Sequence, residues 1–160
     1  MSEENLHRNV KVSGWGSLFT DMSTEMILPV LPAFLVGVLK APPGAVGLIE
    51  GVAESTASLF KYISGYISDK IRKRKLLVVL GYSFSAFVKP LLYFATSWTF
   101  VLAIRFLDRV GKGIRTSPRD ALIADSSGKK KGKPFGFQRF MDTLGAVFGS
   151  TIALLILRTN

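Results

Sequence analysis

Ionisable side chains lie inside long apolar stretches of this 160-residue sequence. An embedded carboxylate can exchange protons as water gains access to it, and an embedded arginine can bind an anion. Each such group costs at least ~2.5 kcal/mol at the centre of a bilayer, so a purely structural bundle would avoid them. The near balance of acids and bases predicts that they pair with one another. They are Asp21, Glu25, Glu50, Glu54, Asp108 and Asp142, with Lys61, Lys89, Arg105, Arg109 and Arg139.

The spacing of these residues predicts shared helix faces, because helical residues three or four apart are neighbours. That spacing joins Asp21 to Glu25, Glu50 to Glu54, Arg105 to both Asp108 and Arg109, and Arg139 to Asp142. Glu25, Glu54, Asp108 and Arg109 are expected ~13–17 Å from the helix ends, near the middle of a ~30 Å core. Asp21 and Glu25 are the first proton-coupling candidates and Glu54 is the third. The alternative is that the pairs are salt bridges that only lock helix packing.

Five apolar segments must position these charges, after a polar leader at residues 1–13. Hydrophobic residues make up 48% of the chain, and the mean hydropathy is +0.33. A membrane-spanning helix needs ~20 mostly apolar residues, which four of the segments meet comfortably. The sequence therefore predicts an all-α integral membrane fold with about five spans. The segments are residues 14–39, 45–68, 76–96, 98–114 and 135–157.

The basic residues alternate between connections, and the formal net charge is +10. The leader, the 69–75 connection and the 115–134 connection are rich in Lys and Arg, whereas the other two connections contain only Lys40. Cytoplasmic loops retain Lys and Arg. This pattern predicts a multi-pass protein of the cell (inner) membrane with a cytoplasmic N-terminus and the lipid bilayer as its partner. Nucleic-acid binding is disfavoured because the basic residues are concentrated in every second connection, as expected for membrane topology.

Several kinds of chemistry have no support in the residue types. The sequence has no cysteine and only one histidine, which excludes disulfides and thiolate metal sites. No phosphate-binding loop, nucleophile elbow, zinc signature or dinucleotide fingerprint is present in it. We therefore expect no enzyme activity, metal or cofactor.

The segment GYISDKIRKRK resembles the loop between the second and third helices of major facilitator superfamily transporters, G-x-x-x-D-[RK]-x-G-R-[RK]. The second glycine of that pattern is Arg72 here. Further on, RFLDRVGKGIRTSPRDALIADS and FGFQRFMDTLGAVFG resemble a prokaryotic branch with D-R-x-G-K-G-I-R-x-x-P-R-D-A after the fourth helix. The resemblance covers nearly the whole chain after residue 14. The matching residues are Gly65, Asp69, Lys70, Lys73 and Arg74 in the loop, and Gly111, Lys112, Gly113, Arg115, Pro118, Arg119 and Asp120 in the central motif.

The resemblance implies most of the N-terminal half of a transporter with about twelve spans, whose small-molecule substrate lies between two halves. A proton or ion gradient would drive it. The Asp69 loop would act as a cytoplasmic gate, with Arg109 as its charge partner. The stretch from Gly145 to Gly149, a G-x-x-x-G that permits close helix contact, resembles an antiporter motif, which continues with proline where this chain has Ser150.

The sequence lacks a sixth span and a second half, so we expect a fragment that does not transport alone and whose partner is the missing C-terminal half, in the same or a separate chain. The alternative is a non-transporting membrane subunit, or a half-transporter that binds a partner. Neither the substrate nor the direction of transport follows from the sequence.

Overall fold

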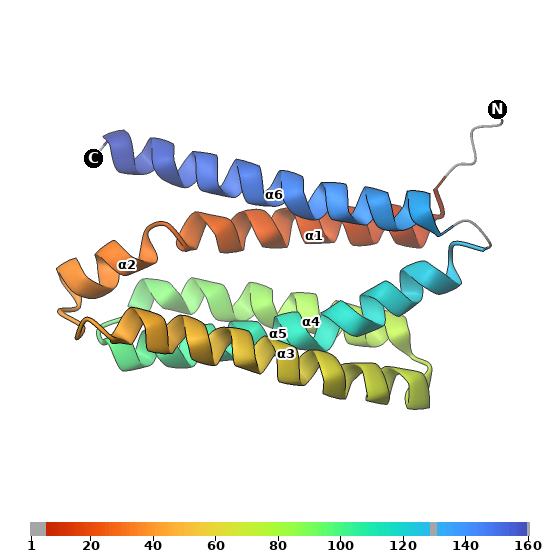
Figure 1. Ribbon diagram of the computed structural model, residues 1–160, viewed down its shortest axis with the longest axis horizontal. Helices are drawn as coiled ribbons and strands as arrows, with labels where there is room; N and C mark the ends of the chain where they lie inside the picture. The colour runs from red at the N-terminus through yellow and green to blue at the C-terminus, as the bar shows by residue number, and fades with distance from the viewer. Residues whose placement is uncertain (1–5, 129–130, 160) are drawn as a thin grey trace. The chain divides into compact units, whose positions relative to one another are not determined.

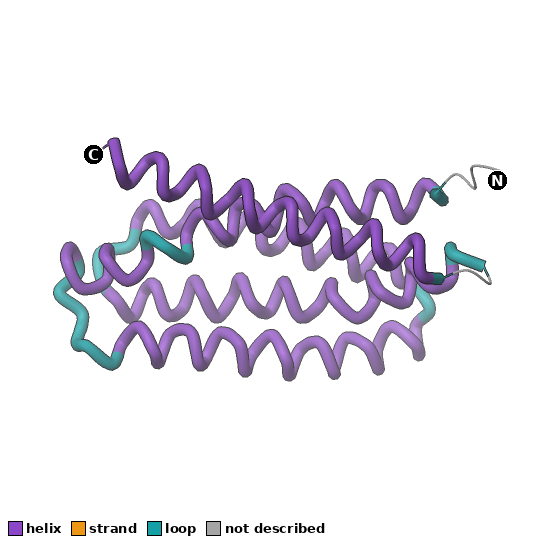
Figure 2. The backbone as a smooth tube through the Cα atoms, turned by 45° about the horizontal axis from the view of Figure 1, so that its top comes forward, coloured by secondary structure: helices purple, strands orange, loops and turns teal. Residues whose placement is uncertain are grey.

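A computed structural model describes residues 6–128 and 131–159 of the chain, which fall into two compact units. The first unit comprises residues 1–28 and 119–160, and the second comprises residues 29–118. Figure 2 shows helices joined by short loops, with no strand in the described ranges. The all-α prediction is confirmed.

The first unit is built on two long helices, α1 (Arg8–Ile27) and α6 (Gly132–Thr159), which lie side by side (Figure 1). Helix α1 begins inside the expected leader, because the His7 imidazole accepts a hydrogen bond from the Asn9 N–H and caps the helix. Residues 1–5 of the leader lie outside the described part of the chain.

Glycines let α1 and α6 approach closely. A Cβ added to Gly145 would overlap the carbonyl oxygen of Leu18, and one added to Gly149 would overlap that of Met22. A Cβ on Gly14 would lie 2.6 Å from a ring carbon of Phe137. The G-x-x-x-G stretch thus faces the backbone of α1, where small residues allow close helix contact.

The second unit contains α2 (Leu31–Ala33), the π-helical η1 (Phe34–Val38), α3 (Ala45–Ile71), α4 (Arg74–Val88), the 3₁₀ helix η2 (Lys89–Phe94) and α5 (Trp98–Asp125) as far as Pro118. Helices α3, α4 and α5 run alongside one another in Figures 1 and 2. The expected first span is interrupted by a turn at residues 28–30. Pro29 lies in that turn and Pro32 opens α2, because proline cannot donate within a helix.

The two glycines of the central motif are points of helix contact in the second unit. A Cβ on Gly111 would lie 2.6 Å from the Ser85 Oγ of α4. On Gly113 it would lie 2.9 Å from the Ala57 carbonyl oxygen of α3. The Ser64 hydroxyl also donates to the Gly113 carbonyl at 2.8 Å. The G-K-G spacing therefore lets α5 pack against two helices at one level.

Helix α5 is longer than the sequence predicts. A connection was expected at residues 115–134, but α5 continues to Asp125 with Pro118 inside it. Helix-forming residues follow this proline, and Ile123 is fully buried, so packing maintains the helix past the missing N–H. Lys129 and Lys130 of the expected basic connection lie outside the described residues.

Among the described residues, three helical stretches are long and apolar enough to cross a membrane by length and composition: Arg8–Val38, Arg74–Phe94 and Gly132–Arg158. Helices α3 and α5, with 27 and 28 residues, are also long enough. Their charged residues lower their hydropathy, and these two helices are not among the three. Membrane crossing by α3 and α5 stays a prediction from the sequence pattern.

Arg72 ends α3 in the left-handed conformation, with φ 57° and ψ 13°. This is the position at which the family pattern has its second glycine. A non-glycine residue there is strained by ~1–2 kcal/mol. We expect Arg72→Gly to raise the free energy of unfolding by about 1 kcal/mol. The melting temperature of the chain in detergent measures this effect. Lys75→Gly, inside the first turns of α4, is the control and should lower it; a fall in both would contradict the explanation.

Candidate functional site

Four charged residues of α3 and α5 form an ion-pair ladder, defined as Glu50, Glu54, Arg105 and Arg109. The Arg105 Nη2 donates to both Glu50 carboxylate oxygens, at 2.7 and 2.9 Å. The Arg109 Nη1 lies 3.0 Å from Glu54 Oε1, and its Nη2 lies 3.9 Å from Glu50 Oε2. The four-residue spacing on both helices places two acids opposite two bases.

The two rungs of the ladder differ in solvent exposure and bonding. Both arginine side chains are buried, at 2% and 3% exposure, whereas Glu54 is 64% exposed and Glu50 32%. Arg105 holds Glu50 through two hydrogen bonds from one nitrogen. Arg109 contacts its carboxylates as ion pairs but donates no hydrogen bond to any described residue. The Glu54–Arg109 rung is therefore the more open and the less tightly bonded of the two.

Asp108 lies between Arg105 and Arg109 in the sequence and is buried, but its carboxylate pairs with neither arginine. Its backbone carbonyl accepts a hydrogen bond from the Ser85 hydroxyl at 3.2 Å. Its carboxylate has no hydrogen-bond or ion-pair partner within residues 6–128 and 131–159. Lys61, which the spacing places near the face of Glu54, is exposed and unpaired within the same ranges. The expected Arg105–Asp108 face thus contributes only its arginine to the ladder.

The predicted gate loop, residues 69–75, has a pairing different from the expected one. Asp69 pairs with Arg74 across the α3–α4 turn at 3.5 Å, in an exposed position. Arg109 was expected to be its partner but faces Glu54 instead. Asp69 is fifteen residues beyond Glu54, or ~22 Å along the helix, so one arginine cannot reach both. Lys70 and Lys73 are exposed at the same turn.

A second buried polar cluster lies in the first unit and joins α1, the end of α5 and α6. Arg119 donates to Ser17 Oγ at 2.8 Å and lies 3.5 Å from Asp142 Oδ1. Gln138, which is 1% exposed, donates to Ser17 at 2.7 Å and to Asp142 at 2.9 Å. Arg119 also binds Asp120 at 3.2 Å. The exposed Arg139 lies 3.6 Å from the other Asp142 oxygen.

The rest of the central motif packs inside the second unit. The buried Arg115 guanidinium lies 4.6 Å from the centre of the Tyr82 ring and donates to Ser85 at 3.2 Å. This cation–π contact ties α5 to α4. Gly65 lies against Ser117, whose Oγ would be 2.7 Å from an added Cβ. These residues position the helices that carry the ladder. Lys112 is half-buried.

Asp21 and Glu25, the first coupling candidates, lie on α1 in the other unit from the ladder. Both are half-buried. Asp21 has an interaction partner, whereas the Glu25 carboxylate has none in the part of the chain that the structure describes. Their role in coupling stays a prediction. No group of three or more His, Asp or Glu suited to a metal ion occurs among the described residues.

Sequence reasoning missed the uncharged members of both clusters. Ser17 and Gln138 bind Arg119 and Asp142, and Ser85 and Tyr82 bind Arg115. Serine and tyrosine are common in apolar helices, so their identity gives no signal. Gln138 could have been found, because a glutamine within a membrane-spanning stretch usually bonds to a partner.

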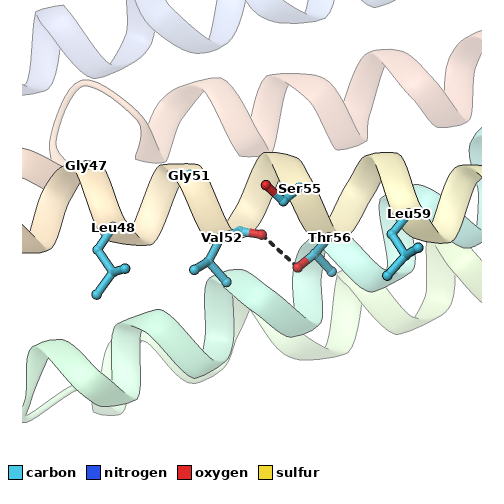
Figure 3. A pocket seen from close by; sticks show the side chains of 7 residues that line it. All are labelled: Gly47, Leu48, Gly51, Val52, Ser55, Thr56 and Leu59. Carbon is cyan, nitrogen blue, oxygen red and sulfur yellow. Dashed lines mark hydrogen bonds between the residues drawn. The ribbon is translucent and has the colours of Figure 1, made fainter.

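A groove of about 460 Å³ runs along the second unit and is lined entirely by α3 residues (Figure 3). Its glycines and Ser55 alternate with Leu48, Val52 and Leu59. Thr56 donates to the Val52 carbonyl of its own helix at 2.7 Å. The groove is therefore lined by small and mainly apolar residues, and neither Glu50 nor Glu54 is among them.

Residues 14–160 match the Major Facilitator Superfamily. An uncharacterized MFS-type transporter of Methanocaldococcus jannaschii is 44% identical over 156 residues, which is 98% of this chain and 39% of that protein. The uncharacterized MFS-type transporter YqjV of Bacillus subtilis is 25% identical over 87% of this chain and 34% of its own length. An uncharacterized protein of Mycobacterium tuberculosis is 29% identical over 89% of this chain and 35% of its own.

Long apolar helices that carry paired charges are typical of membrane transporters. The chain belongs to the Major Facilitator Superfamily, and the family prediction is confirmed. It is a multi-pass membrane protein. The chain spans between about a third and two fifths of the length of the curated relatives that it matches.

Proposed function

We propose that this chain forms the N-terminal part of a secondary transporter that moves a small molecule across the cell (inner) membrane, driven by a proton or ion gradient. The ion-pair ladder carries this proposal. Helix packing alone does not require the buried Arg109 beside the largely exposed Glu54, and embedded charges of this kind mark transport pathways. The family membership supports the same function.

The proposed orientation places the N-terminus and the gate loop in the cytoplasm. The support is the alternation of basic connections. Glu54, with Asp21 and Glu25, is the proposed proton or ion acceptor, and Arg105 and Arg109 balance its charge. The transport cycle of the family needs two halves that rock against each other, so we propose that the chain transports only together with a C-terminal half.

The test is transport by the chain joined to the further length that its relatives possess, reconstituted in vesicles with a pH-sensitive dye inside. Sugars, amino acids, carboxylates and phosphate are added in turn. One of them should move protons with it, and Glu54→Gln should abolish that coupling. A complete transporter that moves no solute, with or without a pH gradient, would disprove the proposal.

The gate loop gives a separate prediction. Asp69 is exposed and its contact with Arg74 is long, so Asp69→Asn should change the free energy of unfolding by at most about 1 kcal/mol. As a gate residue it should nevertheless slow transport several-fold. Uptake rate and melting temperature are measured on the same preparation. Unchanged uptake would remove the gate role, and Lys75→Gln in the same loop serves as the control.

A membrane subunit that binds a partner without transporting is the second candidate, and the α3 groove favours it (Figure 3). Small residues along a helix face allow a second membrane helix to pack closely. Gly51→Leu would fill the groove, since nothing lies within 4 Å of a Cβ there. If this variant lost a co-purifying membrane partner while vesicles of the wild type moved no solute, the subunit function would replace the transporter.

A further inference from the structure

The Arg109 guanidinium is buried without using its capacity to donate hydrogen bonds. Its side chain is 3% exposed, and its Nε–H is buried with no partner in the described part of the chain. An arginine has five N–H donors, and a buried donor without an acceptor is destabilising. Arg109 has the ion pair with Glu54 at 3.0 Å and the longer contact with Glu50 at 3.9 Å. Arg109 is therefore a buried cation whose hydrogen-bonding capacity is not used by any described residue.

Glu54 is the group that can leave. Its side chain is 64% exposed, so water and protons reach it, and it makes no hydrogen bond to Arg109 that meets a normal geometry. Glu50, by contrast, is held by Arg105 through two hydrogen bonds. A proton on Glu54 removes its attraction for Arg109. Arg109 would then keep only the 3.9 Å contact with Glu50.

We infer that the ladder binds an oxyanion, a carboxylate or phosphate group of the substrate, at Arg109 in place of the protonated Glu54. Guanidinium groups bind both kinds of anion through paired N–H donors. The inference deepens the proposed function and rests on it, because it names the substrate class and the coupling residue of the same site. It also gives the two rungs different roles. The Glu50–Arg105 rung is structural, whereas at the Glu54–Arg109 rung the carboxylate is exchanged for the anion.

Charge balance couples the proton to the anion. The four ladder residues carry two positive and two negative charges, and they sum to zero. A proton alone would leave the ladder at +1, and a monovalent anion alone would leave it at −1, next to buried arginines where an unpaired charge is unfavourable. One proton with one monovalent anion restores zero. For a monovalent anion the coupling is therefore one to one and electroneutral.

Other ionisable groups of the second unit must be considered. Glu50 is fixed by Arg105. Asp108 is buried and unpaired in the described residues, so it is the competing proton acceptor. Lys89 is buried and has a partner, and Lys61 on the same helix as Glu54 is exposed. Separate variants of Glu54 and Asp108 distinguish the two carboxylates.

The test is binding of two probe anions to the purified chain in detergent, measured as the rise in melting temperature at constant ionic strength against chloride. Sulfate represents a tetrahedral phosphate-like group and formate a carboxylate, and both keep their charge between about pH 5 and pH 8. The half-saturating concentration of at least one should be at least about tenfold lower at the acid pH, because only the protonated fraction binds. The probe that binds better identifies the group.

Variants assign the effect to residues. Glu54→Gln mimics the protonated form and should bind the probe equally well at both pH values. Arg109→Lys keeps a charge but loses the planar fork, and it should weaken binding at least tenfold, on the order of 1.4 kcal/mol. Lys61→Gln is the matched control and should behave as the wild type. The inference is overturned by no oxyanion effect, by full binding in Arg109→Lys, or by pH dependence that disappears in Asp108→Asn but persists in Glu54→Gln.

These outcomes are separate from those of the transport test. Vesicles that transport while the chain shows no oxyanion binding overturn this inference and leave the proposed function standing. Oxyanion binding at Arg109 in a protein that moves no solute would overturn the proposed transport function and leave the oxyanion site standing. Binding is measured on the 160-residue chain itself.

Discussion

Glu50→Ala should lower the free energy of unfolding of the chain by about 3–5 kcal/mol, because it leaves Arg105 as a buried cation without its carboxylate. The Arg105 side chain is 2% exposed and cannot turn outward to water without unpacking α5. Its Nε–H is already buried without a partner, so no second acceptor is available within the described residues. Arg105→Ala should also lower the free energy of unfolding, because it removes the same ion pair.

The measurement is thermal unfolding in detergent, where ~1 kcal/mol corresponds to ~2–4 °C for a chain of this size. A double variant, Glu50→Leu with Arg105→Met, removes both charges and should restore most of the lost stability. Arg74→Gln, which breaks the exposed pair with Asp69, is the control and should change stability by less than about 1 kcal/mol. A double variant as unstable as the single one would mean that the pair is not the source of the effect.

Residue spacing predicts that the ladder has two rungs, but it does not predict which acid pairs with which arginine. Two acids four apart on one helix and two bases four apart on another can meet only as two rungs, provided that the helices are neighbours. The structure makes α3 and α5 neighbours and brings the rungs to hydrogen-bond and ion-pair distance. The identity of the acid that each arginine contacts depends on the vertical offset of the helices. The close contact of Gly113 with the α3 backbone at Ala57 constrains that offset, and no charge pattern reveals it.

The extent of α5 and the conformation of Arg72 could not be predicted from the sequence, for physical reasons. Helix α5 passes Pro118 because burial of residues such as Ile123 outweighs the lost hydrogen bond, and the strength of packing is not visible in a local pattern. Arg72 adopts the left-handed conformation despite its Cβ, and in this conformation its N–H donates to the Ser68 carbonyl at the end of α3. The mismatch with the family glycine was visible in the sequence, but its structural meaning was not.

The Asp69–Arg109 expectation was wrong because a motif gives residue types and not distances. Both residues belong to the second unit, and the ~22 Å between the levels of Asp69 and Glu54 exceeds the reach of any arginine. Arg74 satisfies Asp69 from five residues away. Because Asp69 pairs locally with Arg74, Arg109 is available to pair with Glu54 in the ladder. The gate loop and the proposed exchange site are therefore separate.

Gly145→Ala should lower the free energy of unfolding by about 1–3 kcal/mol, which is the second large effect. The added Cβ overlaps the Leu18 carbonyl oxygen, a backbone atom that cannot rotate away, so α1 and α6 must separate. In an open helix position the same substitution would be favourable by about 0.5–1 kcal/mol. The contact must therefore outweigh a gain in helix propensity.

Gly136→Ala, at an open position earlier in α6, provides the matched control, because nothing lies within 4 Å of a Cβ there. It should raise the melting temperature slightly while Gly145→Ala and Gly149→Ala lower it. The difference between the two positions isolates the α1–α6 contact from helix propensity, since the residue change is identical. Because Ser17, Gln138 and Asp142 bridge the same helices, separation of α1 and α6 should also expose this polar cluster, which hydrogen exchange at Leu18 and Gly145 would detect. Equal melting temperatures for the two alanine variants would show that α1 and α6 do not pack through these glycines.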